Sequence, residues 1–465
     1  MKHFKFRLLT SALLCGRIPT GQAALNAVDP GPYTAATGFF PQWYQDAHAV
    51  ALELCLSKAQ STRVPGAPGA PSYMCTLLPN PGIFDDLLPI VFPTNYPDEG
   101  FYFTADAAID ATTVPDAQGI VLGYGAAVEA AFGGGVPAPG DQVTFARIRI
   151  RVDIPVGFDG TYRITHPYGV ETFFNVPAGR RTINMTRDIG LGSADFTGAL
   201  AGDIGPFLRS RYGPYTETNP DTGELETFIG DPNLTTLVDI NNVPTPVPGE
   251  LVTGSPFHTN YVRIERLEGG IDVTTDVFAV TGKLFATALP TPLTIERSTY
   301  SQGTLGIFDS FQTDVFALAP PTAVLEFTDA LANTSPMHDF DADDGFYGYK
   351  FYGFGTTSLP APGSTIEVTT PNPGGGTDSS SSALTDQVTI HSATYSLGSD
   401  VLNVEAASSD EINLPLLTLV GTPLPPAAGP AGVTFTMGPL TIPPATVTVT
   451  SASGGSDMEA VILIP

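Results

Sequence analysis

Residues 294–301 read T-I-E-R-S-T-Y-S, and residues 389–396, which lie 95 positions later, read T-I-H-S-A-T-Y-S. Each copy leads, through alternating apolar residues, to a segment rich in Val and Thr, at 365–370 and at 446–451, that is followed by a glycine cluster. A period of about one hundred residues with strand-like ends is typical of consecutive β-sandwich modules. The repeat therefore predicts an all-β fold, with tandem immunoglobulin-like β-sandwich modules in an elongated array.

The repeat and the turn signals around it divide the chain into modules. Residues 286–384 and 385–465 hold the two copies, and we expect an immunoglobulin-like module from each, the second repeating the first. A hairpin pattern near residue 170 closes an N-terminal β-rich module at 24–178. Residues 179–285 then form a second β module, which is rich in loops.

A linker-like stretch, P-G-G-G-T-D-S-S-S-S-A at residues 373–383, lies between the two copies. Its composition is typical of a flexible connection. Alignment of the copies, however, matches it to residues 453–457, the turn before the last strand of the second copy. We therefore interpret it as a hairpin loop within the third module.

Residues 141–153 have the clearest strand pattern in the chain. Arg147, Arg149 and Arg151 share one face, whereas apolar residues such as Ile148 share the other. This period of two predicts a β-strand.

The composition supports many short strands and disfavours one class of partner. The sequence contains 49 Gly and 44 Pro, which favour turns and disfavour long helices. Its 47 acidic and 20 basic residues give a formal net charge of −27. A nucleic-acid-binding protein needs a basic surface to displace counterions, so we expect no nucleic-acid partner. We also expect no membrane span, because no segment is long and apolar enough.

The first 23 residues have the pattern of an export signal. A basic start precedes a short apolar run, and small residues surround a cleavage site near Ala23 or Ala24. A lipoprotein signal at Cys15 is the alternative, although Leu14 is bulky where a small residue is expected. We therefore expect residues 1–23 to be a signal peptide and the protein to be secreted or held at the cell surface.

Two cysteines, Cys55 and Cys75, remain after the signal and can form a single pair. A disulfide that closes a loop of about 20 residues would contribute roughly 3 kcal/mol in the chain-entropy account. Export to an oxidising compartment would permit it. Two free, buried thiols are the alternative, and we favour the disulfide.

An acidic segment, M-H-D-F-D-A-D-D-G at residues 337–345, occurs in the first copy and has no counterpart in the second. Oxygen ligands at alternating positions suit Ca²⁺. The candidate ligands are Asp339, Asp341, Asp343 and Asp344. The segment departs from a calcium-binding loop because Asp344 stands at the glycine position and Lys350 at the twelfth position. Calcium is thus the one cofactor that the sequence suggests, and a solvated acidic turn is the interpretation that we favour.

An aromatic segment, F-Y-G-Y-K-F-Y-G-F at residues 346–354, follows immediately. In a strand, Tyr347, Tyr349 and Phe351 would share one face, and Tyr352 would lie on the other with Phe354. Aromatic residues on both faces suggest sugar stacking or a docking surface for a partner. Packing against a neighbouring module is the competing interpretation. The candidate binding residues are Tyr347, Tyr349, Phe351 and Tyr352.

Motifs of hydrolytic enzymes do not occur in the sequence. The six histidines form no H-x-x-H or H-E-x-x-H pattern, and there is no G-x-S-x-G nucleophile elbow. Asp46 and His48, close to Trp43, are a conceivable acid/base pair, but two residues in a loop carry little weight. We therefore predict no catalytic residues.

Several stretches of the mature chain resemble secreted, mainly bacterial proteins that are built from immunoglobulin-like β-sandwich modules and are uncharacterised. These stretches are F-P-Q-W-Y-Q-D (40–46), L-E-L-C-L (52–56), G-T-Y-R-I-T-H-P-Y-G (160–169), I-G-P-F-L (204–208) and G-S-P-F-H-T-N-Y-V-R-I-E (254–265). The resemblance covers most of the mature chain and implies the fold. It implies no functional residue.

The sequence as a whole suggests a secreted or cell-surface, non-enzymatic, multi-module protein. We expect a role in surface structure, adhesion or the binding of a protein or glycan partner. The alternative is an extracellular carbohydrate-active enzyme with appended β-sandwich modules.

Overall fold

The computed structural model describes residues 25–192, 195–240, 242–305, 308–339, 350–356, 360–421, 427–429, 432 and 434–465. These residues form β-strands joined by turns, with two short 3-10 helices, η1 (Ala35–Thr37) and η2 (Phe196–Ala201). Within this part of the chain, every helix is too short or too polar to cross a bilayer. The all-β prediction is confirmed, and the predicted signal peptide lies outside the described residues.

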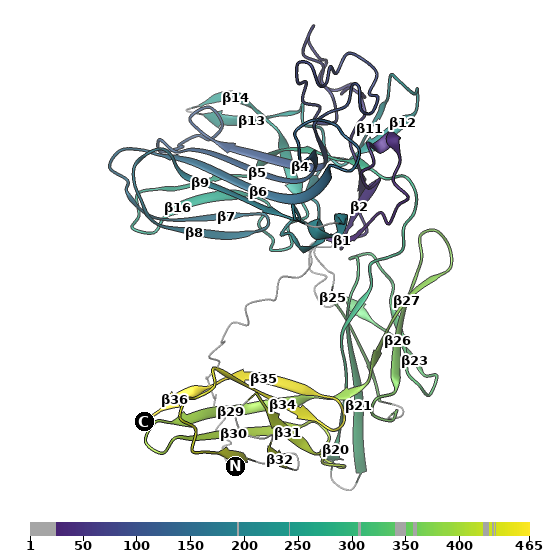
Figure 1. The fold of residues 1–465 in the computed structure, drawn as a ribbon, viewed down its shortest axis with the longest axis vertical. Helices are drawn as coiled ribbons and strands as arrows, with labels where there is room; N and C mark the ends of the chain where they lie inside the picture. Colours follow the sequence, from purple (N-terminus) through teal and green to yellow (C-terminus); the bar gives the residue numbers. More distant parts are fainter. Residues whose placement is uncertain are drawn as a thin grey trace, which may run out of the picture.

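The N-terminal body, residues 25–284, contains three sheets and a separate hairpin (Figure 1). The largest sheet has the order β10 (Arg209–Ser210), β15 (Glu250–Thr253), β18 (Val277–Thr281), β4 (Glu99–Ile109), β5 (Val121–Phe132), β6 (Gln142–Ile154) and β9 (Gly179–Ile189). A second sheet, with β17 (Asp272–Thr275), β16 (Val262–Arg266), β7 (Gly160–His166) and β8 (Gly169–Val176), lies across its inner face. The third sheet has the order β1 (Leu25–Val28), β2 (Trp43–Asp46), β3 (Ala51–Glu53), β19 (Lys283–Leu284), β12 (Leu225–Phe228) and β11 (Tyr215–Thr218). The hairpin joins β13 (Thr235–Ile240) to β14 (Val243–Pro248).

One large hydrophobic core, with buried residues from Leu25 to Val280, runs through this body, and a small separate cluster surrounds the disulfide. The predicted boundary between residues 178 and 179 therefore does not separate two cores. Strands on either side of it are hydrogen-bonded neighbours, because β9 pairs with β6 and β16 pairs with β7. The hairpin at β7 and β8 was correctly placed, but the sequence could not show that the chain later returns to the same sheets.

The predicted disulfide is confirmed: Cys55 and Cys75 are bonded, with their Cα atoms 5.4 Å apart. Both cysteines are buried in a small cluster with Ala59, Met74 and Phe228. The bridge closes a loop that packs against the third sheet through Phe228 of β12.

Two further two-sheet sandwiches follow the N-terminal body (Figure 1). The first is here called the proximal sandwich. One of its sheets has the order β24 (His338–Asp339), β25 (Lys350–Gly355), β21 (Phe308–Leu318), β20 (Thr294–Leu305) and β28 (Thr385–Asp386). The other has the order β23 (Thr334–Pro336), β22 (Glu326–Thr328), β26 (Thr365–Pro371) and β27 (Thr377–Ala383). The second is here called the distal sandwich. One of its sheets has the order β33 (Thr434–Met437), β30 (Val401–Ser408), β29 (Val388–Ser396) and β36 (Ile462–Ile464). The other has the order β32 (Ala427–Gly429), β31 (Leu417–Val420), β34 (Thr446–Ser451) and β35 (Ser456–Ala460). Each sandwich has its own core.

Apart from β24, which has no counterpart among the described strands of the distal sandwich, the two sandwiches share a strand order. In each, the first long strand pairs with the second in an antiparallel hairpin and with the last strand in parallel. The register shifts at corresponding points, between Ile295 and Arg297 and between Ile390 and Ser392. The linker-like stretch lies in the hairpin of β26 and β27. Its serines form strand β27, so this stretch belongs to the proximal sandwich.

Candidate functional site

An aromatic surface lies on the outward-facing side of the proximal sandwich, formed by Arg297, Phe316, Tyr352 and Phe354. Strand pairing brings these residues together from β20, β21 and β25, because Arg297 is opposite Phe316 and Phe316 is opposite Tyr352. The alternation of each strand directs neighbouring residues such as Phe351 into the core, where only 3% of that side chain is exposed. The aromatic surface is therefore the part of these strands that is not needed for the core.

The rings of the aromatic surface form a continuous row. The centroids of Phe316 and Tyr352 are 4.9 Å apart, and those of Tyr352 and Phe354 are 6.0 Å apart with an interplanar angle of 22°. The guanidinium of Arg297 lies over the Phe316 ring at 4.2 Å, a cation–π contact. Phe354 is 51% exposed. The row thus ends in a ring that a ligand can reach.

Polar groups hold the central ring in place. The Tyr352 hydroxyl donates a hydrogen bond of 2.7 Å to Asp314, and the Gln312 side-chain amide donates one of 2.6 Å to the same carboxylate oxygen. Burial, together with the hydrogen bond to Asp314 and its charge, raises the pKa of Tyr352 to about 12. The phenol therefore stays protonated at physiological pH, and the ring is fixed in a defined orientation.

The corresponding face of the distal sandwich carries polar residues in place of the aromatic row. In the same ladder positions, Ser392 pairs with Glu405 and Glu405 with Thr434. Asn403 pairs with Thr436, whose hydroxyl donates a hydrogen bond of 2.9 Å to the Asn403 side chain. Since both sandwiches have the same strand order, the fold itself does not require an aromatic row on this face.

The structure separates the residues that the sequence grouped as candidates. Tyr352 lies in the aromatic surface, whereas Phe351 packs in the core and is not available to stack on a ligand. Tyr347 and Tyr349 lie outside the described residues. Sequence reasoning missed Arg297 and Phe316, which join Tyr352 only through the register of three strands. A position-by-position comparison of the two copies could have identified Arg297, because Ser392 replaces it.

The acidic segment is described only at its start. Asp339 is in β24, opposite Phe351 of β25. The other predicted calcium ligands, Asp341, Asp343 and Asp344, lie outside the described residues. Within the described part of the chain, no group of three or more His, Cys, Asp or Glu side chains could hold a metal ion. Calcium binding by this segment stays a prediction.

Asp46 and His48 form a closed turn. The Asp46 side chain is fully buried, and its carboxylate accepts hydrogen bonds from the backbone N–H groups of His48, Val50 and Phe207, at 2.8 to 2.9 Å. Burial raises the pKa of Asp46 to about 6 and lowers the pKa of His48 to about 4, the latter with a contribution from the charge of Arg209. These contacts join β2 to the segment before β10, which is a structural role.

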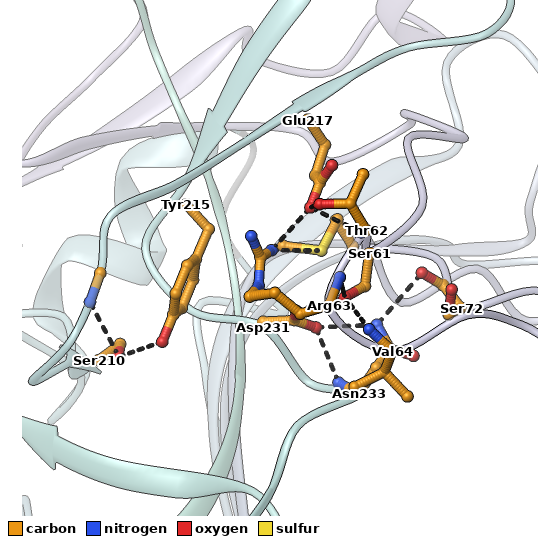
Figure 2. A network of polar contacts seen from close by, with 12 residues as sticks. Ser61, Thr62, Arg63, Val64, Ser72, Ser210, Tyr215, Glu217, Asp231 and Asn233 are labelled. Carbon is orange, nitrogen blue, oxygen red and sulfur yellow. Dashed lines mark hydrogen bonds and ion pairs between the residues drawn. The ribbon is translucent and has the colours of Figure 1, made fainter.

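A network of buried polar groups fastens the disulfide loop to the third sheet (Figure 2). Arg63 forms ion pairs with Glu217 at 2.8 Å and with Asp231 at 2.9 Å, and it lies over the Tyr215 ring at 4.2 Å. The Ser61 hydroxyl donates a 2.6 Å hydrogen bond to Asp231. Buried carboxylates are stable when they are paired and hydrogen-bonded in this way. The network therefore explains why the loop has a fixed position against β11 and β12.

In comparison with known proteins, no family model matches the sequence, and no curated protein matches it.

Proposed function

We propose that this chain is a secreted or cell-surface, non-enzymatic protein made of tandem immunoglobulin-like sandwiches, and that it binds a glycan through its aromatic surface. The row of Phe316, Tyr352 and Phe354 carries the proposal. The Cys55–Cys75 disulfide is compatible with an extracellular location.

A sugar ring offers the two kinds of surface that this site complements. Its C–H groups form an apolar face that stacks on aromatic rings, and its hydroxyl groups form a polar edge. Phe354 offers an exposed ring, and the exposed Arg297 offers guanidinium hydrogen-bond donors beside the row. An apolar protein partner would leave these donors without acceptors, which costs binding free energy. The combination favours a glycan.

The test uses the full chain and a panel of neutral oligosaccharides: hexasaccharides of β-glucan, mannan and xylan. Titration calorimetry should detect binding of at least one of them to the unchanged protein. Phe354→Ala removes the exposed ring and should weaken that binding about tenfold, because a ring contact is worth about 0.5–1.5 kcal/mol beyond its buried area. Since Phe354 is half exposed, the substitution leaves the core intact.

Thr436→Ala in the distal sandwich is the matched control, because Thr436 occupies the position that corresponds to Phe354. This variant should bind as tightly as the unchanged protein. Equal affinity of the Phe354→Ala variant, or no binding to any of the three oligosaccharides, would count against the proposal. Release of shorter sugars from a bound oligosaccharide would instead support the carbohydrate-active enzyme.

A further inference from the structure

Strand β6 carries three arginines on the face of the seven-stranded sheet that points away from the core. Arg147, Arg149 and Arg151 alternate with Ile148 and Ile150, which are buried in the core of the N-terminal body. A strand rises about 3.3 Å per residue, so the Cα atoms of successive arginines lie roughly 7 Å apart along the strand. The whole sequence has 20 basic residues against 47 acidic ones. Three of the basic residues are thus concentrated on one strand of an acidic protein.

These arginines form one wall of a groove with a volume of about 350 Å³, here the arginine groove. Its floor is made by small residues of β5, since Gly123 is opposite Arg151, Gly125 is opposite Arg149 and Ala127 is opposite Arg147. The opposite wall contains Thr104 and Asp106 of β4, together with Thr76 and Leu78 from the segment after the disulfide. This volume is in the range of small-molecule sites.

Gly123 leaves the groove floor open. A Cβ atom built at this residue would meet no atom within 4 Å. At Gly125, the nearest atom to such a Cβ is a carboxylate oxygen of Asp106, at 2.9 Å. Glycine in the interior of a strand often marks a place where a ligand approaches the backbone closely.

Among the described residues, carboxylates neutralise Arg147 but neither of the other two arginines. Arg147 binds Glu129 through Nη1 at 2.8 Å and Asp188 through Nε at 2.6 Å. In the described part of the chain, the Arg149 and Arg151 side chains make no ion pair, and their buried Nε atoms have no hydrogen-bond partner. Repulsion by Arg149, the largest effect, lowers the pKa of Arg151. A bound anion would relieve this repulsion and satisfy both Nε–H groups.

The facing wall offers groups suited to sugar hydroxyls. Thr104 has its hydroxyl 2.7 Å from that of Thr281, and Asp106 is reached by solvent within the groove. Desolvation by the surrounding protein raises the pKa of Asp106 to about 6, although the charge of Arg149 opposes this shift. The groove therefore places two cationic donors opposite a carboxyl group and a hydroxyl group.

We propose that the arginine groove binds an anionic sugar residue, with its carboxylate or sulfate group on Arg149 and Arg151 and its hydroxyl groups on Asp106 and Thr104. This site lies in the N-terminal body and does not depend on the aromatic surface of the proximal sandwich. Planar guanidinium groups bind such oxyanions through paired hydrogen bonds.

Titration calorimetry of the full chain at pH 7 tests the proposal with four probes: trigalacturonate, sulfated trigalactose, neutral trigalactose and inorganic sulfate. We expect binding of the carboxylated or the sulfated trisaccharide, and the comparison of these two identifies the anionic group. The double variant R149Q/R151Q should weaken binding by about 30-fold or more, because it removes both charged donors. Gly123→Leu should abolish it by filling the floor, where a Cβ atom would meet no atom within 4 Å.

Arg163→Gln on β7 is the matched control, since it removes an exposed arginine of the same body that is paired with Glu265. Its affinity should equal that of the unchanged protein, and Phe354→Ala should also leave binding at the groove unchanged. The proposal is overturned if neither anionic trisaccharide binds, or if inorganic sulfate binds as tightly as the trisaccharides. It is also overturned if R149Q/R151Q and Gly123→Leu both bind like the unchanged protein.

The pH dependence gives a second readout. Asp106 shares the groove with Arg147, Arg149 and Arg151 of β6, with Glu99 of β4 and with Glu129 of β5, and Asp188 of β9 is paired with Arg147. Burial raises the pKa of Glu129 to about 7, so Asp106 and Glu129 both lose negative charge as the pH falls, and the affinity for trigalacturonate should rise about threefold between pH 8 and pH 5. Asp106→Asn should remove the part of this rise that lies near pH 6, and an unchanged profile in that variant would contradict the assigned role of Asp106.

Discussion

Tyr300 in the proximal sandwich and Tyr395 in the distal sandwich occupy corresponding positions, yet their hydroxyl groups bind different partners. Both are almost fully buried, at about 1% exposure. The Tyr395 hydroxyl has two acceptors within reach of its one proton, the Leu440 carbonyl at 2.5 Å and the Asp400 carboxylate at 3.0 Å, and both belong to its own sandwich. The Tyr300 hydroxyl donates to Asp410 of the neighbouring sandwich at 3.0 Å. Tyr395 therefore forms its hydrogen bond within one sandwich, whereas Tyr300 links the two sandwiches.

The residue two positions later shows the same contrast. The backbone N–H of Gln302 donates a 3.0 Å hydrogen bond to the Ser409 carbonyl of the distal sandwich. The Gln302 carbonyl accepts a 2.9 Å hydrogen bond from the backbone N–H of Glu411. At the corresponding position, Leu397 donates its N–H to Ile464 of its own sandwich. Corresponding residues of the two sandwiches therefore form hydrogen bonds with different partners: those of Gln302 reach the neighbouring sandwich, and that of Leu397 stays within its own. The difference lies in the residues that follow the shared T-Y-S sequence.

The largest loss of stability is expected from substitution of Asp410, which accepts the hydrogen bond that Tyr300 sends across the junction. Its buried carboxylate accepts hydrogen bonds from the side chains of Tyr300 and Gln302 and from the backbone N–H groups of Ile412 and Asn413. Asp410→Ala would leave several of these donors buried without an acceptor, at a cost of about 3 kcal/mol in the free energy of unfolding. Hydrogen–deuterium exchange of the full chain should show faster exchange in both sandwiches.

The control for this change is Asp410→Asn, which keeps the shape and one acceptor oxygen and should cost about 1 kcal/mol. If exchange in β20 is the same in the unchanged protein and in the Asp410→Ala variant, the two sandwiches are not coupled through this residue.

A smaller effect is expected at the hairpin turn between β34 and β35. Gly455 donates its N–H to Asp386 at 2.9 Å, and a Cβ atom on Gly455 would lie 2.3 Å from the Asp386 carbonyl oxygen. Gly455→Ala should therefore lower the free energy of unfolding by about 2 kcal/mol, because backbone atoms must move apart. Chemical denaturation of the full chain, followed by fluorescence and circular dichroism, measures the loss.

The corresponding turn of the proximal sandwich provides the control. A Cβ atom on Gly374 would meet only the Asn372 side chain, at 3.1 Å, and the Ala288 Cβ, at 3.7 Å. Gly374→Ala should cost about 0.5 kcal/mol or less. Equal losses for the two variants would show that the distal turn is not constrained by its contact with Asp386.

Local patterns in the sequence predicted the parts of this fold that depend on nearby residues. The alternation of 346–354 correctly separated Phe351, which is buried, from Tyr352, which faces outward. The pairing of Cys55 with Cys75 was also predictable, because only two cysteines remain after the signal.

Features that depend on strand register could not be predicted. The arginines of β6 were visible as an alternating row, but Gly125 and Asp106 become their neighbours only through the pairing of β4, β5 and β6. The large core that residues on both sides of position 178 share was missed for the same reason, since β18 pairs with β4 across more than 160 intervening residues. Pairing between distant segments leaves no periodic signal in the sequence.

The smallest effects concern the two tyrosines themselves. Tyr300→Phe and Tyr395→Phe each remove one hydroxyl donor and keep the ring, so each should cost about 1 kcal/mol. The two variants should differ in where hydrogen–deuterium exchange becomes faster. Tyr300→Phe should speed exchange around Asp410 as well as in β20, because the lost bond crosses the junction. Tyr395→Phe should affect only the distal sandwich, because Leu440 and Asp400 both belong to it. Exchange changes confined to the proximal sandwich in Tyr300→Phe would mean that the other bonds of the junction, from the backbone and side chain of Gln302 and from Ser409, are enough to set its geometry.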